Sequence, residues 1–333
     1  MNFVLIECIN QDYNEDTKKN TIIQPVELNQ LDSTDFIPNK LQDYNDSAFF
    51  DKIKNFFFKE IGYELQGDLY SKYKNAFDFD YLIIISLHNK VEMPKQFKPD
   101  IFKKRNHLDR PYIICGKDID NFKKIESECN EKGYHTSCCH TTLNSKAYIT
   151  EELTSLSQEN KVHAVFHELM HNYISQNKIR MQYNYEEALC EVIGNYFTLK
   201  FAKTNNEIDN EIVEREIIKN EKFYQCINYY IFEINRGGRN VDSLNNECEK
   251  KIKTIFENTD FSEKMKREDY VNNAYLLFQN SYSEKYFILK KMYLEQPTIT
   301  EFIDKIPIIN SSNVFLQIPY GAILESVKCT KNK

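Results

Sequence analysis

The stretch His167-Glu168-Leu169-Met170-His171 decides how the centre of this chain folds. The residues from Val162 to Ile174 that surround it are apolar in almost every direction around a helix. A helix of this kind belongs in a protein core. Two imidazoles and a carboxylate are costly to bury there alone, and a bound cation lowers that cost. Because residues four apart share one helix face, both histidines can point at the same ion.

The next predicted helix carries acidic residues on an apolar background. Glu187 and Glu191 are four residues apart, so they share a face of this helix, whereas Glu186 points about 100° away from Glu187. A tetrahedral catalytic zinc takes three protein ligands and leaves one position for water. Two carboxylates on one buried face therefore indicate the source of a third ligand.

Together, the two segments resemble the gluzincin metallopeptidases. In that family a His-Glu-x-x-His helix is followed, after a loop, by a helix that carries a glutamate ligand. Many bacterial members have Glu-Gly-x-Ala-Glu-Tyr there, and Glu187-Ala188-Leu189-Cys190-Glu191-Val192 is similar to a degraded form of it. Ala188 stands for the usual Gly, Cys190 for Ala and Val192 for Tyr. The resemblance covers residues 160–200, with a faint extension to residue 295.

The resemblance implies a role for each polar residue of the two helices. His167, His171 and Glu187 are expected to hold Zn²⁺, with water in the fourth position. Glu191 is expected to orient a ligating histidine. Glu168 is expected to act as general base toward the zinc-activated water and to pass the proton to the leaving amine.

A competing assignment exchanges the roles of Glu187 and Glu191. Glu191 follows His171 by twenty residues (171 to 191), which is the spacing in thermolysin. In that assignment Glu191 is the ligand and Asn195 its partner. Local motif similarity favours Glu187.

A further similarity concerns the oxyanion of the tetrahedral intermediate. The segment 273–278 is similar to the helix after the active site in bacterial gluzincins, where a tyrosine can face the cleft. This implies Tyr275 as a hydrogen-bond donor to the oxyanion, with Tyr270 and Tyr320 as further candidates. The alternative is that Tyr275 is a core aromatic.

Other histidines and cysteines give weaker signals. His163 lies one turn before His167 on the same face, as a core histidine or a residue that lines the cleft. Cys138, Cys139 and His140, with His135 and Cys129 nearby, form a possible second zinc site, but adjacent cysteines seldom build a zinc knuckle and no matching pair follows. We therefore expect one zinc site.

The order of the elements, strands before helices, predicts an α+β fold. The expected architecture is a zincin-like catalytic core, with a small mixed sheet and the active-site helices, and a mostly helical C-terminal part. The expected division is an N-terminal α+β region at 1–75, a catalytic core at 76–205 and a helical subdomain at 206–333. Predicted strands lie at 3–6, 21–23, 81–87, 110–116, 146–150 and 314–318. Predicted helices lie at 47–63, at 157–176 with Ser155 or Ser157 as cap, and at 185–203, 206–235, 243–258, 268–282 and 285–294.

Composition narrows the function classes. The chain has 333 residues, 41% of them hydrophobic, and a net charge of −7. This charge argues against nucleic-acid binding, and no apolar run is long enough for a membrane span. Nine cysteines without regular spacing, and a start that lacks a signal-peptide pattern, predict reduced thiols and a cytoplasmic location. Non-classical export stays open, as does the oligomeric state.

The sequence therefore predicts a zinc metallopeptidase that acts on a peptide or protein. The segment 146–150 is expected to be an edge strand that pairs with an extended substrate backbone. One alternative is an inactive, zincin-fold interaction protein whose zinc is structural. The other is a secreted effector or toxin protease with the same chemistry.

Overall fold

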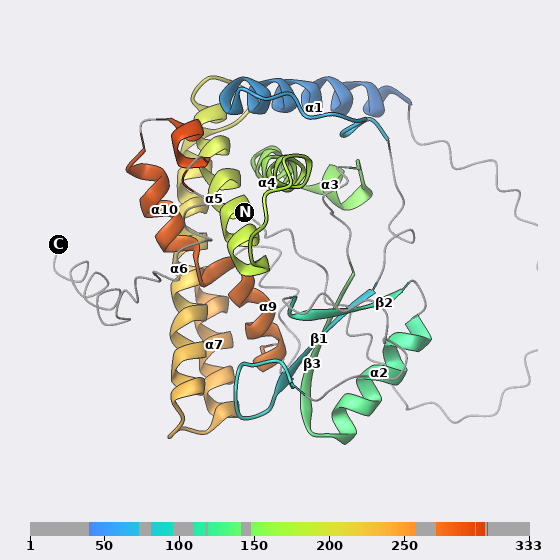
Figure 1. Cartoon of the computed structure of the whole chain (residues 1–333), viewed down its shortest axis with the longest axis vertical. Coiled ribbons are helices and arrows are strands. Elements are labelled where there is room, and N and C mark those ends of the chain that lie inside the picture. Colours follow the sequence, from blue (N-terminus) through green and yellow to red (C-terminus); the bar gives the residue numbers. More distant parts are fainter. Residues whose placement is uncertain are drawn as a thin grey trace, which may run out of the picture.

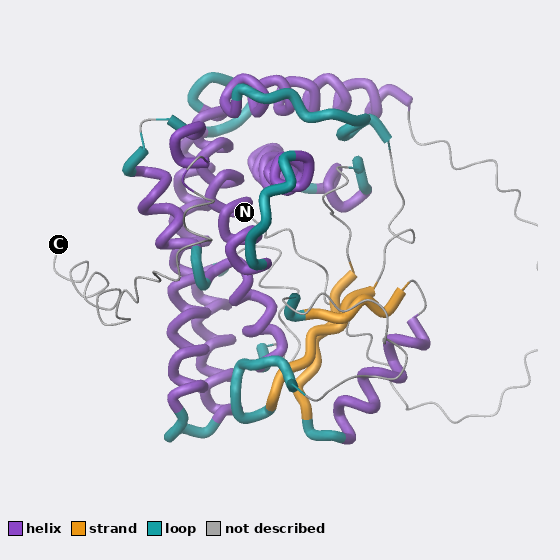
Figure 2. Tube along the Cα trace, viewed as in Figure 1, coloured by secondary structure: helices purple, strands orange, loops and turns teal. Residues whose placement is uncertain are grey.

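A small sheet stands beside a larger group of helices, which makes the chain α+β (Figures 1 and 2). The structure is a computed structural model that describes residues 40–72, 81–95, 110–116, 119–140, 148–257, 271–296, 298–303 and 305. The strands predicted at 3–6, 21–23 and 314–318 lie outside the described residues.

The sheet has three strands in the order β2-β1-β3. β1, Tyr81–Leu87, lies in the centre and pairs antiparallel with β2, Tyr112–Gly116, and with β3, Tyr134–His140. The prediction of a mixed sheet is therefore wrong for the described strands, which are all antiparallel. β1 is covered on both faces, as its continuous apolar sequence predicted. Ile83 and Ile85 pack with α2, Ile119–Glu131. Leu82 and Ile84, on the opposite face, pack with α9, Asn273–Ser283.

The third strand is not the predicted one. Among the described residues of the segment 146–150, only Ile149 forms a bridge, and its N–H donates to the Lys72 carbonyl at 3.0 Å. β3 takes the place beside β1 and pairs with it along all seven residues. Its sequence, Tyr-His-Thr-Ser-Cys-Cys-His, has too few apolar residues to show the alternation that indicates a strand. A substrate strand along 146–150 has no support in the residues described there.

Apart from the short helix α3, Glu151–Ser155, which was not predicted, the helices after residue 150 begin and end within a few residues of the predicted positions. Capping explains several of these ends. The Ser157 hydroxyl accepts the Asn160 N–H at the start of α4, and Gly237, with φ of 77°, ends α6. The remaining helices follow in chain order. They are α1 Lys40–Ile61, α3 Glu151–Ser155, α4 Gln158–Gln176, α5 Tyr183–Ala202, α6 Asn210–Arg236, α7 Val241–Ile255 and α10 Tyr286–Leu294.

One main core joins α1 with the helices from α3 to α10, whereas α2 packs with β1 in a separate cluster. α1 lies across α4 and α5 (Figure 1), and its Phe57 ring is 6.3 Å from Phe166 of α4 and 5.7 Å from Phe197 of α5. α6 and α7 form a hairpin beside α5 and α9. This packing holds α4 and α5 against each other at the level of the two predicted motifs. Among the described residues, no helix is long and apolar enough to cross a membrane.

Candidate metal centre

Two packed helices bring together the three predicted zinc ligands. His167 and His171 project from α4 and Glu187 from α5, and all three are buried. His167 Nε2 and His171 Nε2 lie 3.2 Å apart. Glu187 Oε2 lies 3.4 Å from His167 Nε2 and 3.5 Å from His171 Nε2. Three potential ligand atoms from two helices therefore converge on one point.

His167 Nε2, His171 Nε2 and Glu187 Oε2 form a triangle, whose sides can be compared with the ligand separations of a zinc site. With bonds of about 2.0–2.1 Å, two ligand atoms of a tetrahedral zinc lie about 3.4 Å apart. The three observed separations, 3.2, 3.4 and 3.5 Å, each fall within about 0.2 Å of this value. Two imidazole nitrogens and one carboxylate oxygen are also the donor set of many catalytic zinc sites. In size and in chemistry the residues fit a zinc ion.

Glu186 determines the tautomer of His171. Its Oε1 lies 2.9 Å from His171 Nδ1, and because a carboxylate only accepts, the proton of the neutral ring is on Nδ1. The Nε2 lone pair of His171 is then directed at the triangle. The view of Glu186 as a residue that points away from the site is wrong, because the packing of α4 against α5 brings its carboxylate onto the outer nitrogen of His171.

Glu191 lies on the outer side of His167. Its Oε2 is 3.5 Å from His167 Nδ1, its Oε1 is 3.3 Å from His163 Nε2, and the Asn195 amide donates to it at 3.4 Å. Glu187 thus faces the inner nitrogens of both histidines, whereas Glu191 faces the outer nitrogen of one of them. His163 extends the cluster by contact with Glu191.

Tyr183 is the outer partner of Glu187. Its hydroxyl donates to the Glu187 carboxylate, and burial followed by the charge of Glu187 raises its pKa well above the usual value. Tyr112 of β2 packs edge-on against Tyr183 with the ring centroids 5.6 Å apart, and its hydroxyl accepts from Arg110 at 2.8 Å. Each of the three converging side chains therefore has a polar group behind it, as is typical of metal ligands, although the 3.5 Å contact of Glu191 with His167 Nδ1 is longer than a hydrogen bond.

The charges in the triangle support the same arrangement. Burial lowers the pKa of His167, but Glu187 and Glu191 more than offset this and raise it to about 9. The histidines in turn hold the pKa of Glu187 below its usual range, although burial acts in the opposite direction. Two buried carboxylates thus require positive charge between them, which a proton or a divalent cation supplies.

Glu168 lies beside the triangle on α4 and is 5% exposed. Burial raises the pKa of its carboxyl group, and the two neighbouring histidines partly offset this. Its Oε2 has no hydrogen-bond partner among the described residues. A buried carboxylate oxygen without a partner is costly, and a bound water or a substrate group would lower that cost.

The tyrosine predicted for the oxyanion lies deeper in the fold. Tyr275 of α9 is 2% exposed and belongs to the main core. Tyr282, seven residues later on α9, is half-buried, with its ring centroid 6.2 Å from that of His167. Tyr270 and Tyr320 lie outside the described residues.

Three other residues of the site were not predicted. Tyr183 lies four residues before Glu187, a spacing that could have indicated a shared face. Glu186 depends on the crossing of two helices, which the sequence does not show. Gly194 lets α5 approach α4, because a Cβ at this position would lie 2.8 Å from His163 Nε2.

Comparisons with other proteins add no assignment to this geometry. The chain matches no family model, no curated protein and no solved structure.

Proposed function

We propose that this chain is a zinc-dependent metallopeptidase of the gluzincin type with a zincin-like core. His167 Nε2, His171 Nε2 and Glu187 would hold the zinc ion. The observation that carries the proposal is the triangle of these three atoms, with sides of 3.2–3.5 Å and a polar group behind each side chain. An accidental cluster of buried polar groups has no reason to match both the size and the surroundings of a zinc site.

The geometry favours Glu187 over Glu191 as the third ligand. Glu187 Oε2 is within 3.5 Å of both Nε2 atoms, whereas Glu191 approaches the Nδ1 side of His167 and is shared with His163. In this assignment Glu191 holds the His167 ring in place. Glu186 does the same for His171, with a shorter contact of 2.9 Å.

In the proposed hydrolysis, the cation and the side chains of the protein have separate roles. A bound zinc supplies a Lewis acid that makes water acidic and polarises the scissile carbonyl. Glu168 takes the proton from the attacking water, because its unpartnered carboxylate oxygen lies beside the metal-binding helix face. It later gives this proton to the leaving amine. Tyr282 replaces Tyr275 as our candidate donor to the oxyanion, since it is the α9 tyrosine beside His167.

One feature of the site also suits a non-catalytic role. The three proposed ligands are all less than 10% exposed, as in a structural zinc that joins two helices. A zinc with only a structural role needs no general base. The buried carboxylate of Glu168 and its unpartnered oxygen favour the catalytic function.

The test is cleavage of a fluorogenic peptide library by the wild-type chain and by Glu168→Gln. The matched control is Glu159→Gln, which makes the same substitution at the start of the same helix. We expect the wild type and the control to cleave, and Glu168→Gln to keep its zinc and lose at least about a hundredfold in rate. If the zinc-loaded wild type cleaves nothing, or if Glu168→Gln is as active as the wild type, the assignment is overturned.

A further inference from the structure

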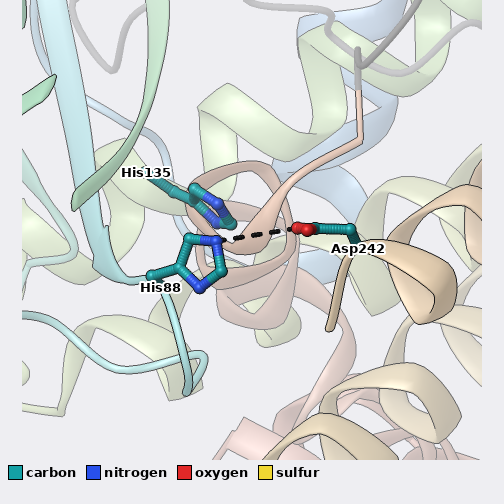
Figure 3. A group of neighbouring side chains, drawn as sticks. All are labelled: His88, His135 and Asp242. Atoms are coloured by element: carbon teal, nitrogen blue, oxygen red, sulfur yellow. Dashed lines mark ion pairs between the residues drawn. The ribbon is translucent and has the colours of Figure 1, made fainter. Parts of the chain in front are cut away.

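A second group of potential metal ligands lies outside the candidate centre (Figure 3). His88 follows β1, His135 lies in β3 and Asp242 is in the first turn of α7. One ligand atom from each lies within 4.8 Å of the others. The two imidazole rings have centroids 4.5 Å apart, and His88 Nε2 is 3.7 Å from Asp242 Oδ1.

The main chain around this group is held by asparagine side chains. Asn273 at the start of α9 is fully buried, and its amide donates to the carbonyls of Leu87 and His88 at 3.0 and 2.9 Å. Its Oδ1 accepts from Asn245 of α7 at 3.3 Å. The neighbouring Asn272 donates to the carbonyl of Thr136, next to His135, at 2.9 Å. These bonds fix the three segments that carry the potential ligands.

The contacts within the group do not explain it as an ordinary ion pair. At 3.7 Å, the atoms of His88 and Asp242 are too far apart for a hydrogen bond. Both side chains are more than half exposed, so an ion pair between them contributes little to stability. Two imidazoles this close repel each other once both are protonated. A cation bound between them replaces that repulsion with attraction.

We propose that His88, His135 and Asp242 form a second metal site, which takes a divalent cation of the zinc type. Two imidazole nitrogens and one carboxylate suit Zn²⁺ and its neighbours in the transition series, whereas Ca²⁺ and Mg²⁺ prefer oxygen ligands alone. Tetrahedral ligand atoms lie about 3.4 Å apart, so binding draws the group together. The exposed His88 and Asp242 side chains have room to make this movement.

His135 limits the affinity of the site. The Asn273 main-chain N–H donates to His135 Nδ1 at 3.3 Å, so the neutral ring carries its proton on Nε2. A cation on Nδ1 displaces the Asn273 N–H. A cation on Nε2 places the ring proton on Nδ1, where it faces the same N–H. Metal binding therefore breaks the hydrogen bond between Asn273 and His135 in either case. With two exposed ligands in addition, the site is expected to bind more weakly than the buried triangle.

Such a site would join the sheet to the helical part of the chain. His88 and His135 belong to the β1 and β3 side, and Asp242 belongs to the α6–α7 hairpin. A cation that binds only the folded arrangement stabilises it in proportion to the logarithm of its concentration. The inference does not depend on the peptidase proposal, because no residue is shared with the buried triangle.

Calorimetric titration of the full, untagged, metal-free chain with Zn²⁺ tests the proposal. The variants are His88→Ala and Asp242→Asn, both at exposed positions. The control is Asp68→Asn, which removes an exposed aspartate paired with Lys72 elsewhere. We expect two zinc equivalents of different affinity in the wild type and the control. We expect His88→Ala and Asp242→Asn to lack the weaker equivalent.

The outcomes separate this inference from the peptidase proposal. If His88→Ala and Asp242→Asn bind the same number of zinc ions as the wild type with the same affinities, the second site is overturned. If the wild type binds only one zinc and His88→Ala binds none, the second site stands and the buried triangle fails. If the wild type binds only one zinc and His88→Ala keeps it, the second site is overturned.

Discussion

Replacement of Gly194 by alanine tests the close approach of α4 and α5 at the candidate centre. A Cβ at this position would lie 2.8 Å from His163 Nε2 and 2.9 Å from His163 Cδ2. Carbon atoms pack best at about 3.5–4.0 Å, so the ring must retreat by about 0.6 Å. It cannot swing into solvent, because His163 is 3% exposed. The shift is therefore passed to Glu191, 3.3 Å from His163 Nε2, and through it to His167.

Two effects oppose each other in the stability of Gly194→Ala. Alanine in a helix interior gains about 1 kcal/mol over glycine. Overpacking a buried site costs about 1–3 kcal/mol. We expect the free energy of unfolding to fall by about 0–2 kcal/mol in urea titrations of the metal-free chain. We also expect zinc affinity to fall by about 10–100-fold, because Glu191 no longer holds His167 in place.

A double-mutant cycle isolates the contact. In the Gly194→Ala/His163→Ala chain, the ring that the new Cβ meets is gone, so the double variant should be destabilised by less than the sum of the two single variants. Chelator competition reports zinc affinity for all four chains. If Gly194→Ala raises the stability by about 1 kcal/mol and binds zinc as tightly as the wild type, α5 does not pack against His163 as closely at Gly194 as described.

Three further substitutions probe the elements that position the site. Glu186→Gln removes the carboxylate that holds His171 Nδ1–H, so zinc affinity measured by chelator competition should fall by about 10–100-fold while the fold stays intact; unchanged affinity would show that Glu186 has no such role. Phe57→Ala leaves a cavity between α1 and the two site helices, and urea unfolding should show a loss of about 3–5 kcal/mol; a loss below 1 kcal/mol would mean that α1 does not pack there. Ser157→Ala removes the cap of α4 and should lower the free energy of unfolding by about 1 kcal/mol in the same assay. An unchanged free energy of unfolding would show that α4 does not begin at Ser157.

The sequence predicts well whatever depends on local pattern. The β1 strand shows as a continuous apolar run, and α4 and α5 show as apolar helices with a serine cap or charged ends. The histidines four residues apart are neighbours on α4 because of helix geometry alone. These features were predicted correctly, as was the α+β class.

What the sequence does not predict depends on how elements meet. β3 was missed because its polar sequence becomes a strand only through pairing with β1. Glu186 was assigned away from the site because its position on α5 says nothing about the approach of α4. Tyr275 was chosen from a local similarity and Tyr282 was not considered, because only the packing of α9 shows which tyrosine lies beside His167. Tertiary packing decides each of these cases.

The most direct test of the central claim is the zinc content of the full, untagged chain after dialysis against a moderate chelator. It is measured by mass spectrometry in the His88→Ala background, which removes the second proposed site. We predict about one zinc per chain, lost on addition of Glu187→Ala and retained, though bound more weakly, with Glu191→Ala. Zinc lost with Glu191→Ala and kept with Glu187→Ala would contradict the ligand assignment. No bound zinc in the starting chain, even after reconstitution, would contradict the metal centre itself.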